Sequence, residues 1–117
     1  MDYKTENGLL VSRKSEAFLY RIYPALINFP KAEKHALCAE IKQTTYALIR
    51  YIEMANSVKS KRFTYAQEAD GYLQTLKVLI KLSRNQKYIS KGFFRELDND
   101  LTEINKLLSG FIRSSKK

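Results

Sequence analysis

The sequence has few residues that interrupt helices, with two prolines and four glycines among 117 residues. Long helices are therefore easy to build. The one cysteine, Cys38, cannot form an internal disulfide, which predicts a reducing, cytoplasmic setting. No apolar run approaches the roughly 18 residues of a transmembrane helix, and the first residues lack the basic and apolar regions of a signal peptide. We therefore expect neither a membrane segment nor a leader.

Patterns typical of catalysis and metal binding are also missing. The one histidine, His35, has no nucleophile or carboxylate that we can place beside it. The last predicted helix carries an acidic cluster: Glu96, Asp98, Asp100 and Glu103. This cluster lacks the Glu-x-x-His pairs of di-metal helical bundles. Phosphate-binding glycine loops, nucleophile elbows and zinc spacings are not found either. The sequence thus predicts no catalytic residue, no cofactor and no metal site.

Positive charge is what the sequence has in excess, because 21 Lys and Arg stand against 12 Asp and Glu, for a net charge of +9. Such a balance favours nucleic acid, an anionic membrane surface or an acidic protein as the partner. The charge is concentrated between Gly71 and Arg95, a stretch without any acid. We predict that its six basic residues bind nucleic acid: Lys77, Lys81, Arg84, Lys87, Lys91 and Arg95. An ordinary solvated helix face is the alternative.

Four segments place apolar residues at the three- and four-residue steps of an amphipathic helix. The first predicted helix starts near Ser12 or Ser15 and is kinked or split at Pro24. The other three span about residues 31–56, 62–86 and 90–114, and Ser90 can cap the last. Four residues of the apolar stripes are predicted to be buried in the core: Leu48, Leu73, Ile104 and Leu108.

The connections between these helices are short, which predicts an all-α fold, an antiparallel up-down-up-down four-helix bundle. We divide the chain into an N-terminal arm over residues 1–13, the bundle over residues 14–114 and a basic tail over residues 115–117.

Two of the predicted helices are apolar on a second side. The first places Tyr20, Tyr23 and Ile27 away from its main stripe, and the third does the same with Val78 and Leu82. A lone four-helix bundle buries one side of each helix, so a second apolar side requires another partner. We predict that these five residues form an interface between copies of the chain, and tyrosine is enriched at such interfaces.

Four short motifs stand in the predicted helices and turns: YPALINFPKAEKHAL (Tyr23 to Leu37), R-x-x-x-x-Q (Arg62 to Gln67), LIKLSRNQKYIS (Leu79 to Ser90) and L-x-E-I-x-K-L-L-S-G (Leu101 to Gly110). Together they resemble the accessory variability determinant (Avd-like) proteins of diversity-generating retroelements. The resemblance covers residues 14–113. The related proteins encoded in 23S ribosomal RNA intervening sequences usually carry Asn-Ile-Ala-Glu-Gly after the second helix. This chain has EMANSVKSK there, which favours the Avd-like branch.

The resemblance implies a homopentameric barrel of four-helix bundles that binds RNA or DNA. It also implies association with a reverse transcriptase during mutagenic copying of a template repeat, without enzymatic activity of the protein itself. Two other functions stay open, a protein–protein adaptor for an acidic partner and a 23S rRNA intervening-sequence protein. A membrane-surface protein is less favoured, because no predicted helix combines a basic face with a large exposed aromatic face.

Overall fold

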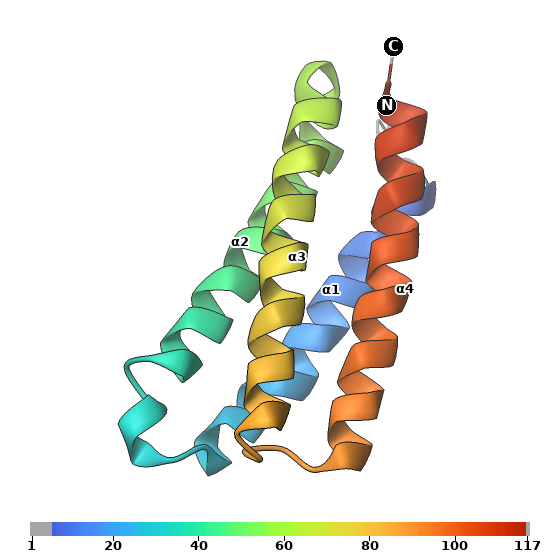
Figure 1. The fold of residues 1–117 in the computed structure, drawn as a ribbon. Coiled ribbons are helices and arrows are strands. Elements are labelled where there is room, and N and C mark those ends of the chain that lie inside the picture. Colours follow the sequence, from blue (N-terminus) through green and yellow to red (C-terminus); the bar gives the residue numbers. More distant parts are fainter. Residues whose placement is uncertain (1–5, 117) are drawn as a thin grey trace.

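The computed structural model describes residues 6–116, which form four long α-helices. These are α1 (Glu6–Ala25), α2 (Leu37–Ser57), α3 (Arg62–Asn85) and α4 (Lys91–Ser115). The helices run alternately up and down, and α1 packs against α4 as well as α2, which closes the bundle (Figure 1). The predicted all-α, antiparallel four-helix bundle is confirmed.

The core lies along the bundle axis, where one apolar side of each helix is turned inward. All four residues that were predicted to be buried are 0% exposed: Leu48, Leu73, Ile104 and Leu108. Burying each of these side chains contributes on the order of 1.5–3 kcal/mol. The helical phase that the sequence predicts for α2, α3 and α4 is therefore confirmed.

The start of α1 differs from its prediction, because the helix begins at Glu6 and not near Ser12 or Ser15. Val11 is fully buried and extends the apolar stripe of α1 toward its N-terminus, so this segment packs on the bundle. Residues 6–13 of the predicted arm are thus helical. Residues 1–5 of that arm and residue 117 of the predicted tail lie outside the described residues.

The connection between α1 and α2 is longer than predicted. Pro24 lies in the last turn of α1, and the helix is interrupted after Ala25, as a proline in that position predicts. Two short 3₁₀ turns follow, Leu26–Asn28 and Lys31–Glu33. The second helix therefore starts at Leu37, not near residue 31. This connection supplies residues to the basic surface and to the pocket that are described below.

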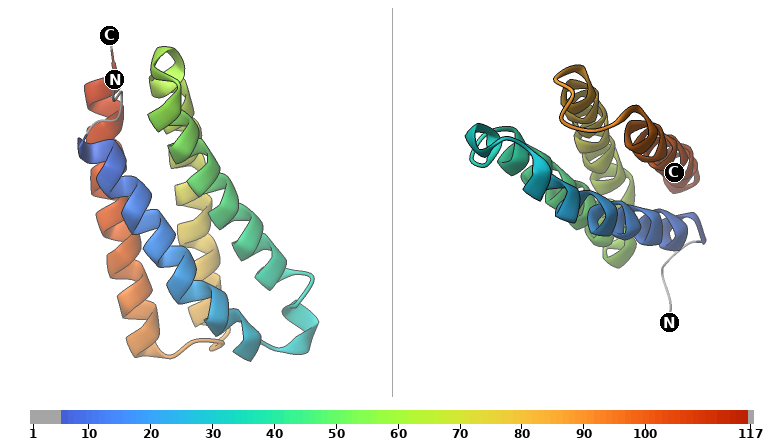
Figure 2. Two further views of the ribbon diagram at one scale, coloured as in Figure 1. Left: turned by 180° about the vertical axis from the view of Figure 1, so that it is seen from behind. Right: turned by 90° about the horizontal axis from the view of Figure 1, so that it is seen from below.

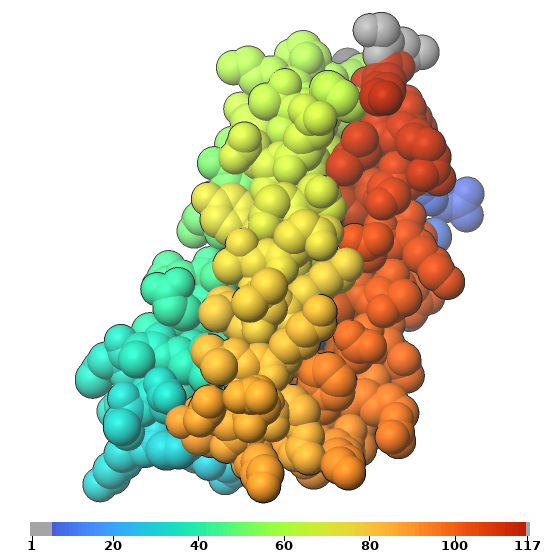
Figure 3. All heavy atoms as spheres, in the orientation of Figure 1, coloured from blue at the N-terminus to red at the C-terminus, as the bar shows by residue number. Residues whose placement is uncertain are grey.

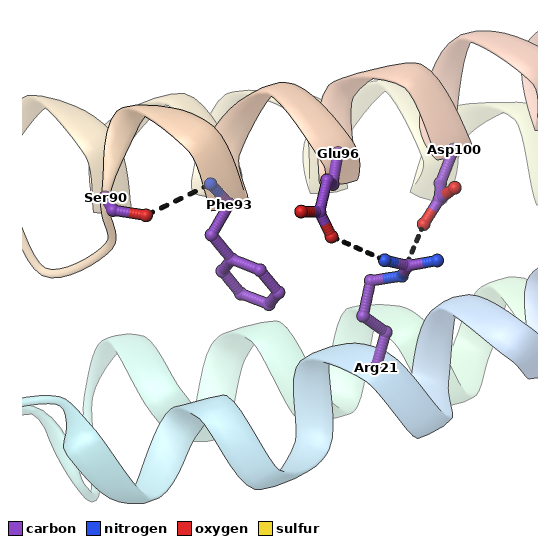
Figure 4. Close-up of polar contacts among 5 residues, drawn as sticks. All are labelled: Arg21, Ser90, Phe93, Glu96 and Asp100. Atoms are coloured by element: carbon purple, nitrogen blue, oxygen red, sulfur yellow. Dashed lines mark hydrogen bonds and ion pairs between the residues drawn. The ribbon is translucent and has the colours of Figure 1, made fainter.

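The two ends of the described chain lie at the same end of the bundle as the connection between α2 and α3. A 3₁₀ turn, Lys59–Lys61, joins α2 to α3 beside the described chain ends (Figure 1). At the opposite end, Ser90 caps α4 as predicted, since its Oγ accepts a hydrogen bond from the Phe93 amide at 3.1 Å (Figure 4). The molecule is 46 Å long, which separates these two ends.

Candidate nucleic-acid interface

Two connections, residues 26–36 and 86–90, pack against each other at the end of the bundle opposite the chain ends (Figure 2). The ring centroids of Phe29 and Tyr88 are 5.3 Å apart. The Tyr88 hydroxyl donates to Glu33 Oε2 at 2.8 Å, and this hydrogen bond raises the pKa of Tyr88 above its ordinary value. Residues 55 positions apart in the sequence thereby form one surface.

Seven basic residues surround this contact, and we call them the basic end: Lys31, Lys34, Lys81, Arg84, Lys87, Lys91 and Arg95. The first two belong to the α1–α2 connection, and the other five follow the chain from the last turns of α3 to the first turns of α4. All are exposed except Arg84, which is half-buried. In Figure 3 the surfaces of these segments meet at the bottom of the molecule.

Lys77, the sixth predicted nucleic-acid-binding residue, lies apart from the basic end. It is half-buried one turn before Lys81, and its Nζ donates to Asn105 Oδ1 on α4 at 3.0 Å. The structure therefore brings five of the six predicted residues together. It adds Lys31 and Lys34, which the sequence analysis does not include among the binding residues.

Arg84 has a second role at the basic end. Its Nη1 donates to the Ile89 carbonyl at 2.9 Å, so the side chain holds the α3–α4 connection closed. The guanidinium has further donors that this bond does not use. Arg84 is for this reason a poor choice for a charge-removal experiment, because its loss would disturb the backbone as well as the charge.

Lys87 has an unusual backbone conformation. Its φ of 65° lies in the left-handed region, where a side chain costs about 1–2 kcal/mol and glycine is the usual residue after a helix. The Tyr88 amide donates back to the Ser83 carbonyl at 2.9 Å, which closes the end of α3. A lysine thus occupies a position where the backbone favours glycine, and it carries its charge to the tip of the basic end.

Three of the four acidic residues in the α4 cluster contact α1, whereas the exposed Asp98 lies beside Lys91 and Arg95 of the basic end. Arg21 contacts Glu96 at 2.7 Å through Nη1 and Asp100 at 3.0 Å through Nε (Figure 4). Lys14 contacts Glu103 at 3.1 Å. Three of the four acids in the predicted cluster are therefore used in ion pairs between helices, each of which contributes about 0.2–1 kcal/mol because the pairs are largely exposed.

Two side chains have a pKa raised mainly by burial. Asp100 is one of them, although Arg21 and Lys14 act in the opposite direction. Cys38 is the other, and its Sγ lies 3.7 Å from the Leu26 carbonyl oxygen. A raised thiol pKa makes Cys38 a weak nucleophile, and its buried position fits a packing role.

The five residues predicted to form an interface between copies are all exposed. Their exposed fractions are 66% for Tyr20, 47% for Tyr23, 82% for Ile27, 61% for Val78 and 41% for Leu82. They lie on two surfaces, one on α1 and the 3₁₀ turn that follows it and one on α3, and these two helices are diagonal to each other in the bundle. We call these the α1 surface and the α3 surface. Each single chain thus presents two apolar surfaces to its surroundings.

A hollow of about 410 Å³, which we call the lysine pocket, lies between the end of α1 and the start of α2. Its apolar wall is formed by Tyr23, Leu26, Ile27, Phe29, Pro30 and the buried Cys38, and its rim by Lys31, Lys34 and Lys42. The Lys42 ammonium lies 4.7 Å from the centre of the Tyr23 ring. No sequence pattern predicts this pocket, because its walls come from two helices and an irregular connection.

Comparison with known proteins decides the family. The family model described as bAvd-like matches residues 9–115, which is nearly the whole chain. The chain belongs to the bAvd-like family. The Avd-like resemblance that the motifs predicted is thereby confirmed, and it extends on both sides beyond residues 14–113.

A solved structure is similar to this bAvd-like protein in fold. It is a protein of unknown function from the S23 ribosomal protein family of Bacteroides thetaiotaomicron. The TM-score is 0.80 at 19% sequence identity, and the match covers 92% of this chain and 98% of that one. Among curated proteins, no significant match to the bAvd-like chain was found.

Residues 6–116 of the bAvd-like protein contain neither a metal-binding cluster nor a membrane-spanning helix. Three or more metal-ligating side chains of the His, Cys, Asp or Glu type do not come together anywhere in this part of the chain. No helix in the described part is both long and apolar enough to cross a membrane. His35 is exposed in the turn before α2.

Proposed function

We propose that this bAvd-like protein is a non-enzymatic nucleic-acid-binding subunit whose basic end contacts the phosphate backbone. The observation that carries the proposal is the packing of two connections that gathers seven basic residues at one end of the bundle. Two of the nearby acids have partners, since Glu33 accepts from Tyr88 and Glu96 pairs with Arg21, and Asp98 is an exposed acid beside Lys91 and Arg95. A dense positive surface of this kind attracts polyanions.

Family membership supports a more specific role. Avd-like proteins accompany the reverse transcriptase of a diversity-generating retroelement, so we propose that this chain supports mutagenic copying as an accessory of that enzyme. Lysines and arginines on an exposed end suit phosphate contacts, which position a protein on nucleic acid without reading bases. Little sequence preference is therefore expected. An adaptor for an acidic protein is the competing function, and the same basic residues would serve it.

Salt dependence tests the phosphate contacts. The plot of log affinity against log salt has a negative slope. In a Lys81→Ala, Lys87→Ala, Lys91→Ala variant this slope should become shallower by about 2–3, since each lost contact removes about 0.7–0.9. Binding of a fluorescent oligonucleotide, measured by anisotropy from low to moderate salt, gives this slope. The matched control removes three exposed charges elsewhere, with Arg13→Ala, Lys106→Ala and Lys116→Ala. Equal slopes in both variants would remove the basic end from the proposal.

Lys87→Gly should change stability and binding in opposite directions. Glycine relieves the left-handed backbone at this position, which should raise the free energy of unfolding by up to about 1 kcal/mol. The same change removes one phosphate contact and should weaken oligonucleotide binding. Urea unfolding and anisotropy on the same preparation measure the two effects. A variant that is more stable and binds as well as the wild type would show that Lys87 does not contact phosphate.

We also propose that the two exposed apolar surfaces join copies of the chain into a closed ring. Contact between the α1 surface of one copy and the α3 surface of the next would be heterologous, and such contacts close into rings when the rotation allows. The family resemblance favours five copies. A ring would gather several basic ends on one polynucleotide and strengthen binding by multivalency.

Light scattering tests this assembly. The wild type should have the mass of about five chains, and Val78→Glu should yield monomers, because a charge placed in an apolar interface is costly to bury. Thr102→Glu adds the same charge to an exposed site on α4, outside both apolar surfaces, and should leave the assembly intact. A wild-type monomer at micromolar concentration would overturn the ring.

A further inference from the structure

We propose that the lysine pocket receives an unpaired base of single-stranded nucleic acid held at the basic end. This inference rests on the proposed nucleic-acid binding and adds to it a class of substrate and a site for the base. Phosphate contacts alone would not distinguish a strand with bases from one without them. A pocket that holds a base beside those contacts would distinguish the two strands.

The pocket and the basic end share two residues. Lys31 and Lys34 belong to the basic end and also stand on the rim of the pocket. A backbone whose phosphates lie against these lysines therefore passes the mouth of the pocket. Lys42 stands on the same rim, and the residues that line the pocket include no acid. The rim thus suits an anionic chain.

The interior of the pocket suits a flat, weakly polar group. Tyr23 is a half-exposed aromatic ring, Leu26 and Phe29 are buried, and Ile27 is the most exposed of the large apolar side chains. The volume of about 410 Å³ lies in the range of small-ligand sites. Bases that are not stacked in a helix bind to protein surfaces of this kind, on aromatic rings beside basic grooves.

Two neighbouring tyrosines allow a matched comparison. Tyr23 lines the lysine pocket, whereas Tyr20 lies one turn earlier on α1 and does not. Both are exposed, and both belong to the surface proposed to join copies. The Tyr20 hydroxyl donates to Glu16 within α1 at 2.5 Å. Loss of either ring should affect assembly, but only loss of Tyr23 should affect a base in the pocket.

The experiment compares two single strands of equal length and charge, one with bases and one made entirely of abasic nucleotides. The wild type should bind the strand with bases about 5- to 100-fold more tightly, the range expected for stacking of one base. Tyr23→Ala should bind the two strands with equal affinity, because any loss of assembly weakens the binding of both strands alike. Tyr20→Ala should keep the preference for bases.

Each other outcome overturns the inference in a recognisable way. Equal binding of both strands by the wild type, with steep salt dependence, would leave phosphate binding intact and remove the base site. A preference that persists in Tyr23→Ala, or that is lost equally in Tyr20→Ala, would place the bases outside this pocket. If the wild type bound neither strand but bound an acidic peptide, the proposed function itself would be wrong.

Discussion

Replacing Arg62 with alanine should lower the free energy of unfolding by about 3 kcal/mol, which is a large part of the stability of a small domain. Arg62 is only 7% exposed. Its Nε donates to the Ala55 carbonyl at 2.8 Å and its Nη2 to the Asn56 carbonyl at 3.1 Å. These carbonyls belong to the last turn of α2, whose oxygens have no partner within the helix. The variant would leave them buried without a donor.

The guanidinium also packs on an aromatic ring, since it lies 5.8 Å from the centre of the Phe111 ring on α4. Arg62 therefore joins the end of α2, the start of α3 and the end of α4. Lysine should not restore the loss, because a single ammonium cannot reproduce the planar fork of donors.

Urea unfolding measures the effect, with Lys61→Ala as the control at an exposed neighbouring position. The control should change stability by less than about 0.5 kcal/mol. A loss below about 1 kcal/mol in Arg62→Ala, or full stability in Arg62→Lys, would contradict this account of the α2 terminus.

The second large effect is expected in the core. Leu108→Ala should cost about 2–5 kcal/mol, because Leu108 is fully buried on α4 and its removal leaves a cavity. Leu82→Ala removes the same atoms from a side chain that is 41% exposed. In a single chain this control should cost well under 1 kcal/mol.

Protein concentration separates the two leucine variants further. If Leu82 lies between copies, its truncation should weaken the assembly and make the apparent stability more dependent on concentration. The loss of stability in Leu108→Ala should not depend on protein concentration, as long as the assembly state does not change. A loss under about 1 kcal/mol in Leu108→Ala would show that the core around α4 tolerates the cavity.

Much of the fold could be predicted because helical periodicity is a local signal. The stripes of α2, α3 and α4 and the cap at Ser90 depend on residues only three or four positions apart. The start of α1 could not be predicted in the same way, since Gly8 is a poor helix former with no side chain to mark a stripe. Its position becomes understandable only with Asn56 and Phe111 in place, because a Cβ on Gly8 would lie 2.2 Å from Asn56 Oδ1.

The candidate site was predictable to a similar extent. The basic run from Lys81 to Arg95 is visible in the sequence, but Lys31 and Lys34 join it only through the contact between Phe29 and Tyr88. Arg62 stands in one of the sequence motifs, but its burial could not be predicted, because an arginine is rarely buried. Contacts between distant segments carry no periodic signal.

The position of the chain ends has a practical consequence. The start of α1 lies beside the end of α4, at the far end of a molecule 46 Å long from the basic end (Figure 1). A dye or a surface anchor attached after Lys116 would leave the basic end unobstructed. Single-molecule fluorescence with a labelled oligonucleotide, using a dye pair whose Förster radius is well below the length of the molecule, should then report inefficient energy transfer on binding. Efficient transfer would mean that the strand runs along the side of the bundle.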